Sequence, residues 1–254
     1  MKKILITGGA TKESINGIMS LTSVSSGKMA TDLAEMFIGS WCEVTLVLSQ
    51  NIPYDLKSPK LKILRFETAQ ELDKIIEHEA RTTQYDIVIH TVKALSYTPE
   101  YFFCMEDLAQ EITDFIGDNA RDINESFTMK DIYREIFRIL TNPECKATNM
   151  LPLTSNLVVK LTPAVDTVYN LRKWFPDSFI CGFECQETDS EKALIDTSLR
   201  LIDKSGLNIV FAANTESATE RLVISRKGFH DIRAIGDEGI FNIVRMIYES
   251  LHIM

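Results

Sequence analysis

The residues best suited to chemistry lie within the first thirty positions. The run Ile4-Leu5-Ile6-Thr7-Gly8-Gly9-Ala10 is typical of a short apolar strand that breaks at paired glycines. Glycine has no Cβ and tolerates positive φ, so such a turn lets the backbone approach a ligand closely. Ser25-Ser26-Gly27-Lys28-Met29 then opens a run with apolar residues at helical spacing. Because the first N–H groups of a helix attract anions, the pattern predicts a phosphate-binding site at Gly8, Gly9 and Ala10.

The local pattern leaves other interpretations open. Gly8-Gly9 lacks the third glycine of the dinucleotide fingerprint and the Gly-Lys-Ser/Thr ending of a Walker A loop. An ordinary strand-to-helix turn has the same residues, and a dehydrogenase-like NAD(P) loop at 7–10 is a further alternative. Lys28 favours a functional interpretation, because the helix dipole disfavours a cation at a helix N-terminus unless an anion binds there.

Composition bounds the class of protein. The chain has 254 residues, which suits one α/β domain with a sizeable core. Its 36 acidic and 27 basic residues give a net charge of −9, which argues against a general nucleic-acid or membrane binder. The five cysteines are odd in number and scattered, as in a cytoplasmic protein with reduced thiols. Cys181 and Cys185 read as buried small hydrophobic residues, and no apolar run is long enough for a signal peptide or membrane helix.

Strand and helix patterns alternate along the chain. Strands are expected at 43–48, 61–66 and 86–90, with a helix over 69–83. This spacing predicts an α/β fold: a Rossmann-like, mostly parallel sheet with helices on both faces, whose ligands collect at the carboxyl ends of the strands.

A stretch at about 100–145 departs from this rhythm and predicts a helical insertion, with helices near 105–115 and 129–140. The alternation then resumes, and residues 1–254 are expected to form a single domain. The later elements are strands at 157–161, 179–183, 208–212 and 222–225 and helices at 164–174, 190–204 and 237–251.

Several motifs follow one another in the order seen in one family. They are Ile6-Thr7-Gly8-Gly9-Ala10-Thr11-Lys12-Glu13, Ser25-Ser26-Gly27-Lys28-Met29, His90, Tyr97-Thr98-Pro99-Glu100-Tyr101 and Gly182-Phe183. Taken together, the chain resembles phosphopantothenate–cysteine ligase, most closely the free-standing bacterial form.

The resemblance implies a ligase of coenzyme A biosynthesis. In that family the carboxylate of 4′-phosphopantothenate attacks the α-phosphate of CTP or ATP, and the amine of cysteine then displaces the nucleotide. Mg²⁺ shares the charge of the triphosphate, and the protein mainly positions two anions. The family also implies a homodimer, for which strands near 151–160 are a candidate interface, and no nucleic-acid or membrane partner.

The resemblance also assigns roles to residues. Gly8, Gly9 and Ala10 would approach the triphosphate, with Ser25, Ser26, Gly27 and Lys28 near the phosphopantothenate. Lys146 would lie on a loop that reaches the triphosphate. The other nucleotide-binding positions are Ser96, Thr162, Pro163, Phe183, Arg200 and Lys204. Pro163 would occupy the first turn of a helix. Each has a structural alternative: Phe183 as a core aromatic, Arg200 and Lys204 as a solvated helix face. His90 reads as a hydrogen-bonded core residue, and no residue is assigned as a metal ligand.

The chain departs from the family at three polar positions. Ser23 stands where the family has an asparagine associated with the acyl-nucleotide intermediate, and a hydroxyl has shorter reach than an amide. Ser96 replaces an aspartate, and Ala213 an asparagine. These changes support a second hypothesis, that the chain is a degenerate paralogue which binds a nucleotide or a pantothenate metabolite without catalysis.

Overall fold

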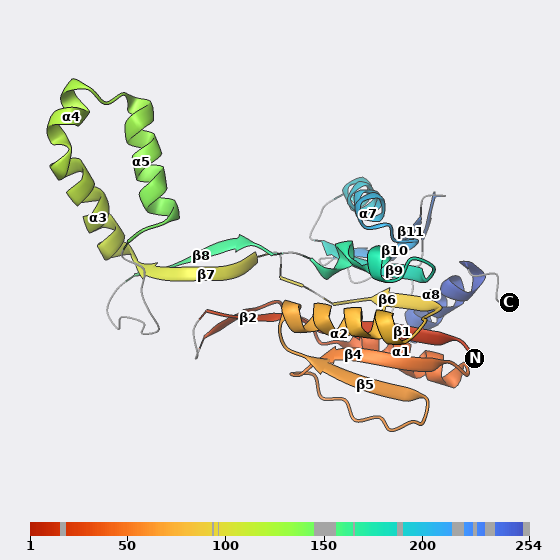
Figure 1. Ribbon diagram of the computed structural model, residues 1–254. Helices are drawn as coiled ribbons and strands as arrows, with labels where there is room; N and C mark the ends of the chain where they lie inside the picture. The colour runs from red at the N-terminus through yellow and green to blue at the C-terminus, as the bar shows by residue number, and fades with distance from the viewer. Residues whose placement is uncertain are drawn as a thin grey trace. The chain divides into compact units, whose positions relative to one another are not determined.

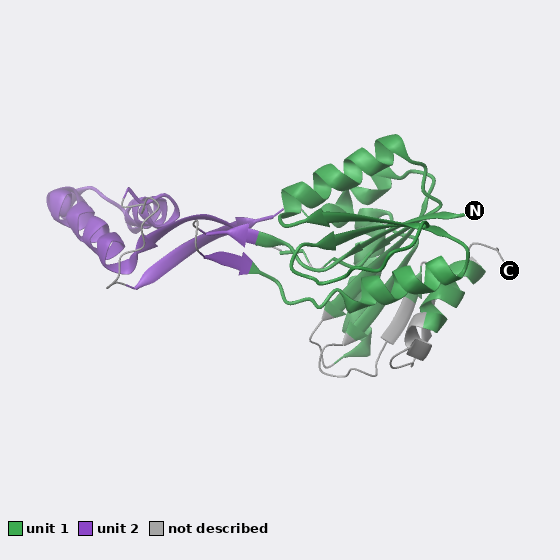
Figure 2. Ribbon diagram, turned by 90° about the horizontal axis from the view of Figure 1, so that it is seen from below, with its two compact units in different colours: residues 1–12, 22–95, 165–254 green, residues 13–21, 96–164 purple. Residues whose placement is uncertain are grey.

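Contacts divide the chain into two compact units (Figure 2). The first comprises residues 1–12, 22–95 and 165–254, and the second comprises residues 13–21 and 96–164. The structure, a computed structural model, describes residues 1–15, 19–92, 94–95, 97–144, 156–164, 166–186, 190–214, 221–225, 228–231 and 237–250. The expectation of a single domain stays a prediction.

The first unit is built on one large sheet (Figure 1). Eight strands of its described part pair in the order β12 (Gly228–Asp231), β11 (Arg221–Ser225), β10 (Ile209–Asn214), β9 (Phe179–Gln186), β6 (Ile87–His90), β1 (Lys3–Gly8), β4 (Glu43–Ser49) and β5 (Leu61–Phe66). The strands from β10 to β5 pair in parallel, whereas β11 and β12 are antiparallel. The predicted mostly parallel, Rossmann-like sheet is confirmed.

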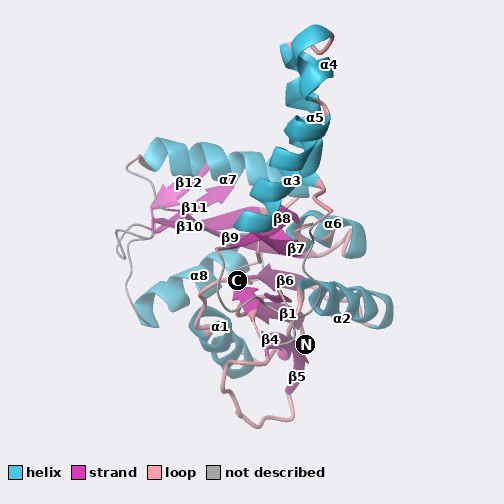
Figure 3. Cartoon of the chain, turned by 90° about the vertical axis from the view of Figure 1, so that its left-hand side faces the viewer, coloured by secondary structure: helices cyan, strands magenta, loops and turns pink. Residues whose placement is uncertain are grey.

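Helices cover both faces of this sheet, as predicted. Strand side chains alternate between two cores: Ile4 and Ile6 of β1 contribute to one, and Leu5 to the other. The first core contains residues of α1 (Lys28–Gly39) and α8 (Asp237–Ser250), and the second contains residues of α2 (Ala69–Thr82), α6 (Leu171–Trp174) and α7 (Glu191–Ser205). Figure 3 shows α1 and α8 on the side of the sheet away from α2 and α6. None of the helices in the described ranges is long and apolar enough to cross a membrane.

Local sequence explains where α2 begins. The Thr68 side chain accepts a hydrogen bond from the Glu71 backbone N–H, and the Glu71 carboxylate accepts one from the Thr68 N–H. This capping box satisfies two otherwise unpaired donors of the first turn. Leu72 and Ile76 follow at helical spacing and are fully buried in the second core.

The second unit has its own small core. β7 (Tyr97–Cys104) and β8 (Leu157–Pro163) form an antiparallel pair. Three helices accompany them: α3 (Met105–Asp118), α4 (Ala120–Glu125) and α5 (Met129–Thr141). Phe103, Leu108 and Ile139 are buried together among these elements. The helices predicted near 105–115 and 129–140 are confirmed. Elsewhere, β2 (Lys12–Ser14) and β3 (Ser20–Thr22) form a separate two-stranded sheet.

The segment after residue 156 agrees only in part with the predictions. The strand expected at 157–161 is present within β8, but it pairs antiparallel with β7 and does not join the parallel sheet. Pro163, expected in the first turn of a helix, lies at the end of β8, and the helix expected over 164–174 is replaced in its described residues by the 3₁₀ helix at Thr167–Tyr169 and by α6. A residue before proline is sterically driven to extended backbone, which explains why Thr162 remains in the strand.

The cysteine prediction holds for one residue of two. Cys181 is fully buried in the first core of the sheet, whereas Cys185 is exposed. Both lie on β9, and the burial of its residues decreases beyond Gly182. Burial also raises the pKa of the Cys181 thiol well above its ordinary value, which favours an inert thiol at that position.

Candidate functional site

The register of the sheet brings the ends of its central strands together. Thr7 of β1 lies opposite His90 of β6, and His90 lies opposite Gly182 of β9. On the other side, Gly8 lies opposite Leu48 of β4. Neighbouring strands are about 4.8 Å apart, so these residues form one continuous carboxyl edge. The predicted glycine turn therefore lies where a doubly wound sheet binds its ligands.

The first two glycines are required by close packing. A Cβ on Gly8 would lie 2.2 Å from the Cβ of Ala30 in α1. A Cβ on Gly9 would lie 2.0 Å from the Ser49 Oγ, and Gly9 also has φ +99°. An L side chain fits neither position without displacing its neighbours. The turn is consequently held against both α1 and the end of β4.

The third glycine joins the turn to the start of α1. Gly27 has φ +66°, and its Cβ would lie 2.2 Å from the Ile52 Cδ1. The same Ile52 atom would lie 2.9 Å from a Cβ on Gly9. One side chain therefore packs against both glycines and sets the separation between the turn and the helix. Neither Ile52 nor Ser49 belongs to a sequence pattern that predicts this role.

The N-terminus of α1 is electropositive. Its first turn contains no acidic residue, and its N-cap, Gly27, has no side chain that could accept a hydrogen bond. The Gly27 and Lys28 N–H groups donate long bonds, of 3.3 and 3.4 Å, to the hydroxyls of Ser25 and Ser26. Backbone N–H groups, hydroxyls and the helix dipole thus converge beside the glycine turn, an arrangement suited to an anion such as phosphate.

Lys28 also has a partner within the helix. Its ammonium group lies 2.7 Å from the Asp32 carboxylate, one turn along α1, and its side chain is 72% exposed. Asp32 therefore offsets the unfavourable interaction of the Lys28 cation with the helix dipole, so Lys28 does not by itself require an anionic ligand.

His90 is a buried, neutral residue beneath this edge. Its Nδ1 lies 2.8 Å from the Thr7 Oγ1, and the residue is 4% exposed. Burial lowers the pKa of His90 from 6.5 to about 4, although the charge of Asp166 opposes the change. A neutral imidazole hydrogen-bonded in the core agrees with the sequence interpretation.

The segment after β6 is held against the same turn. The Thr91 N–H and hydroxyl both donate to the Thr7 carbonyl, at 3.1 and 2.9 Å. The Leu95 N–H donates to the hydroxyl of the fully buried Thr11, at 3.0 Å. These contacts position the backbone that follows β6 beside the residues that follow Gly9.

Arg65 organises the loop that carries Ile52. Its guanidinium donates to the backbone carbonyls of Ser49, Ile52 and Tyr54 at 3.2, 2.8 and 2.8 Å. Each carbonyl would otherwise need a partner from the loop or from water. Arg65 therefore positions Ile52, and through it both glycines, although the sequence analysis did not identify this residue.

Phe183 also lies at the carboxyl edge, one residue beyond Gly182. It is half-buried, and its ring centroid is 5.0 Å from that of Phe211 in β10. The contact with Phe211 supports its interpretation as a core aromatic.

The structure does not bring Arg200 and Lys204 to the site. Both are exposed on the second half of α7, which runs from the carboxyl end of β9 to the amino end of β10. At 1.5 Å per residue, about ten residues separate Arg200 from the start of α7 by roughly 15 Å. Lys204 lies in the last turn, where a cation interacts favourably with the helix dipole.

The remaining predicted residues are distributed over the chain. Ser23 lies in the irregular segment between β3 and α1 of the first unit and is half-buried. Thr162 and Pro163 lie in the second unit, where they pair with Thr98 and Tyr97 in the register of β7 and β8. Ser96 and Lys146 lie outside the described residues.

The groups that could bind a metal are sparse. Within the described ranges, no three His, Cys, Asp or Glu side chains gather closely enough to hold an ion. Mg²⁺ binding to protein alone usually needs such oxygen ligands, whereas Mg²⁺ bound to a nucleotide uses phosphate oxygens and water.

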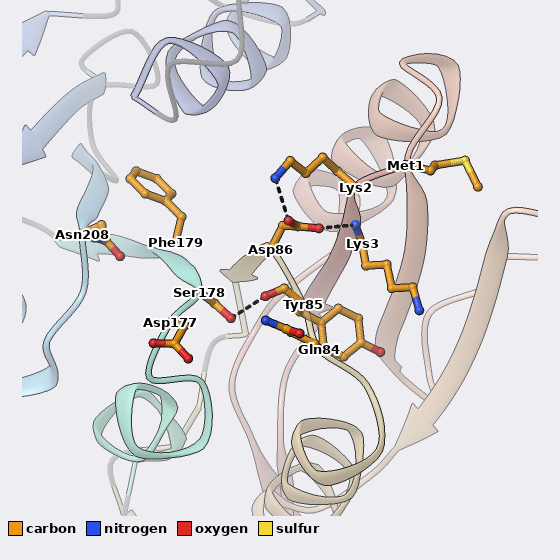
Figure 4. Close-up of a pocket in the computed structure, with 10 residues that line it drawn as sticks. All are labelled: Met1, Lys2, Lys3, Gln84, Tyr85, Asp86, Asp177, Ser178, Phe179 and Asn208. Atoms are coloured by element: carbon orange, nitrogen blue, oxygen red, sulfur yellow. Dashed lines mark hydrogen bonds and ion pairs between the residues drawn. The ribbon is translucent and has the colours of Figure 1, made fainter.

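A hollow at the opposite edge of the sheet is a weaker candidate. Its volume is about 620 Å³, and Figure 4 shows its lining residues from the starts of β1, β6 and β9. The Lys2 ammonium lies 2.7 Å from the Asp86 carboxylate, which also accepts the Lys3 N–H. The Ser178 hydroxyl donates to the Tyr85 carbonyl. These polar groups satisfy one another, so we place the candidate site at the carboxyl edge.

Comparison with known proteins shows what the chain is similar to. Residues 1–102 match the family described as the DNA/pantothenate metabolism flavoprotein C-terminal domain. A coenzyme A biosynthesis bifunctional protein CoaBC of Thermococcus kodakarensis is 26% identical over 85% of this chain and 42% of its own length. The CoaBC of Methanocaldococcus jannaschii is 25% identical over 83% and 40%. The resemblance to phosphopantothenate–cysteine ligases is confirmed.

Solved structures show the same fold as the ligase resemblance implies. The DNA/pantothenate metabolism flavoprotein of Streptococcus pneumoniae has a TM-score of 0.76 at 18% identity, covering 99% of this chain and 100% of that one. A Cab2 variant in complex with phosphopantothenate-cysteine has a TM-score of 0.67 at 13% identity, covering 98% and 86%. The chain spans about two fifths of the length of the curated relatives it matches.

Proposed function

We propose that the protein is a ligase that joins 4′-phosphopantothenate to cysteine in coenzyme A biosynthesis. The observation that carries the proposal is the glycine turn of β1 packed directly against the electropositive start of α1, whose N-cap is a glycine. The similarity to CoaBC proteins over 85% of the chain supports the choice of substrates.

The reaction would have two steps. The carboxylate of 4′-phosphopantothenate attacks the α-phosphate of CTP or ATP, pyrophosphate leaves, and an acyl nucleotide forms. The amine of cysteine then attacks the acyl carbon, the nucleoside monophosphate leaves, and an amide results. The nucleotide, with its Mg²⁺, supplies the activation, so the protein needs to position anions and offset charge on phosphate.

The residues at the carboxyl edge have matching roles. Backbone N–H groups around Gly9 would bind the triphosphate, and the Ser25 and Ser26 hydroxyls with Lys28 would bind a second phosphate. Phe183 would stack on the base. His90 would hold Thr7 in place without exchanging protons, since burial keeps its imidazole neutral at pH 7. We also propose a cytoplasmic homodimer, and sedimentation as a monomer at working concentration would contradict the dimer.

A second candidate function follows from Ser23, Ser96 and Ala213. If loss of polar groups at these positions has removed the chemistry, the protein would bind a nucleotide or a pantothenate metabolite without ligation. Ala213 lies on β10 opposite Cys185 of β9, and its methyl group offers no hydrogen bond there.

One assay separates the two functions. The protein is incubated with 4′-phosphopantothenate, Mg²⁺ and either CTP or ATP, with and without cysteine, while pyrophosphate release and product mass are measured. Pyrophosphate with an amide product supports the ligase and gives its nucleotide preference. If neither nucleotide gives pyrophosphate or product, in protein that still binds one of them, the result favours the binding protein.

The triple variant Ser23→Asn, Ser96→Asp, Ala213→Asn gives an independent test of the second candidate. New ligase activity in this variant would support loss of function by these substitutions. A folded triple variant that gains no activity would count against that explanation.

A further inference from the structure

The Lys28 side chain is directed along α1 and away from the start of the helix. Its Nζ lies 2.7 Å from the Oδ2 of Asp32, which is one turn further along α1. Side chains of a helix ordinarily tilt toward its N-terminus, so a lysine in the first turn would otherwise extend its ammonium group beside Gly27. A basic residue followed four positions later by an acidic one is also the less favourable order of a helix ion pair. Asp32 therefore draws the ammonium group away from the place where an anion would bind.

The two ends of this ion pair differ in exposure. The Asp32 side chain is 20% exposed, whereas that of Lys28 lies mostly in solvent. In the other ion pairs that the described helices form between residues four apart, the acidic side chains of Glu77, Glu125 and Glu249 are at least 42% exposed. The surroundings of Asp32 thus fix its carboxylate, while the ammonium group of Lys28 can turn about an exposed stem. A change of partner is open to Lys28 and not to Asp32.

The negative charge on this side of α1 exceeds that of Asp32 alone. Lys28 is the single basic residue of α1, whereas Asp32 and Glu35 are both acidic and lie three apart on one face. Burial raises the pKa of Tyr54, in the loop after β4, to about 12, and the charges of Glu35 and Asp32 add to the increase. Both carboxylates therefore act on the same side of α1, and Lys28 offsets one of their two charges.

A phosphate bound at the start of α1 would compete with Asp32 for the same ammonium group. A helix ion pair between side chains in contact with water is weak. A phosphate monoester carries about two negative charges at pH 7. It would also accept hydrogen bonds from the first N–H groups of the helix, where the dipole favours an anion. The phosphate would therefore take Lys28 from Asp32, but its binding would be weaker by the free energy of the broken ion pair.

We propose that Asp32 is a positioning residue that competes with the phosphate of 4′-phosphopantothenate for Lys28 and thereby weakens its binding. The inference rests on the proposed function, which assigns Lys28 to that phosphate. Without substrate, Asp32 holds the ammonium group one turn along α1. When the phosphate binds, Lys28 turns to it and leaves Asp32. The product, 4′-phosphopantothenoylcysteine, keeps the same phosphate, so the competition also favours its release.

The affinity of the full chain for 4′-phosphopantothenate, measured by isothermal titration calorimetry, tests this role. Asp32→Asn removes the charge at nearly constant volume, so it should lower the Kd about two- to fivefold, as expected for a weak ion pair. Asp32→Glu keeps the charge, and its Kd should stay closer to that of the parent than to that of Asp32→Asn. Glu77→Gln removes the acidic partner of Arg81 on α2 and is the matched control, which should leave the Kd unchanged.

Lys28→Met separates competition for Lys28 from general repulsion of anions. In the Lys28→Met background, Asp32→Asn should no longer tighten binding, because the ammonium group that it would release is absent. A gain of the same size in that background would overturn the proposal. Unchanged or weaker binding by Asp32→Asn in the parent chain would overturn it as well.

Turnover gives a second measurement, which a purely structural role of Asp32 would not move. In the pyrophosphate assay, Asp32→Asn should lower the KM for 4′-phosphopantothenate while the KM for the nucleotide stays that of the parent. Equal changes in both KM values would indicate a general effect on the site and overturn the inference. A parent chain that binds no 4′-phosphopantothenate would contradict the proposed function and this inference together. A parent that binds it, with no gain in Asp32→Asn, would contradict the inference alone.

Discussion

Single side chains at the glycine turn give the most direct test of the candidate site. Gly27→Ala adds a Cβ beside the Ile52 Cδ1 at a positive φ, which should cost about 2–4 kcal/mol of unfolding free energy. It should also reduce ligase or nucleotide-binding activity, because the start of α1 would shift. Chemical denaturation and the pyrophosphate assay measure the two effects.

Gly39→Ala is the matched control for this substitution. Gly39 is exposed at the end of the same helix, and an added Cβ there meets no atom within 4 Å. Alanine should increase stability by about 0.5–1 kcal/mol, since it is the better helix former. Equal losses of unfolding free energy in the two alanine variants would mean that close packing at Gly27 does not contribute to stability.

His90 should make stability depend on pH. Its pKa is about 4 in the folded protein and 6.5 when exposed, so the unfolded chain binds more protons between these values. Burial of the neutral His90 therefore contributes on the order of 3 kcal/mol to the unfolding free energy, relative to low pH. This contribution is fully present above pH 6.5 and is lost as the pH falls towards 4. Denaturation at several pH values should show a shallower loss for His90→Gln. If the unfolding free energy of His90→Gln depends on pH as steeply as that of the parent, another group causes the pH dependence.

The local residue pattern was sufficient to predict part of the site. Gly8, Gly9 and Gly27 are identifiable because each adjoins a strand or helix start in sequence. Ser49, Ile52 and Arg65 could not be found in this way, since their role depends on residues 49–54 lying against the glycine turn. Such contacts between distant segments have no periodic pattern in the sequence.

At the scale of elements, the loop after β4 depends on one guanidinium. Arg65→Lys keeps the charge but cannot reach three carbonyls with the same planar geometry, so we expect a loss of about 1–3 kcal/mol. The KM for the nucleotide should rise more than kcat falls, because Ile52 would no longer fix the turn. Arg81→Lys, on the exposed face of α2, is the control and should change neither quantity.

The accuracy of the sequence prediction differed between elements for a physical reason. The strands predicted at 43–48 and 61–66 are confirmed, with β4 one residue longer, because short apolar runs bounded by turn residues leave few alternatives. Leu157-Val158-Val159 has the same pattern, yet it pairs with β7 outside the main sheet. β7 itself was missed because it contains Pro99, which is tolerated next to a register shift between Pro99 and Tyr101. Pairing partners are set by topology, which local propensity does not encode.

At the scale of the whole molecule, ligand binding should be visible as thermal stabilisation. A nucleotide at about one hundred times its Kd adds about 2.7 kcal/mol to the stability of the folded state. For a chain of this size, each kcal/mol shifts the Tm by roughly 2–4 °C. We therefore expect the preferred nucleotide with Mg²⁺ to raise the Tm by roughly 5–10 °C in calorimetry. No shift with either CTP or ATP would contradict the ligase proposal and would restrict the second candidate function to binding of a pantothenate metabolite.

The position of Ile52 between two glycines links three sites that are far apart in sequence. Its Cδ1 would collide with a Cβ on either Gly27 or Gly9. Shortening residue 52 to valine removes that atom, so Ile52→Val should partly rescue Gly27→Ala while weakening the parent chain. A selection for restored function from Gly27→Ala should therefore recover smaller residues at position 52. The evolutionary freedom of the glycine turn is then set by the size of the side chain at position 52.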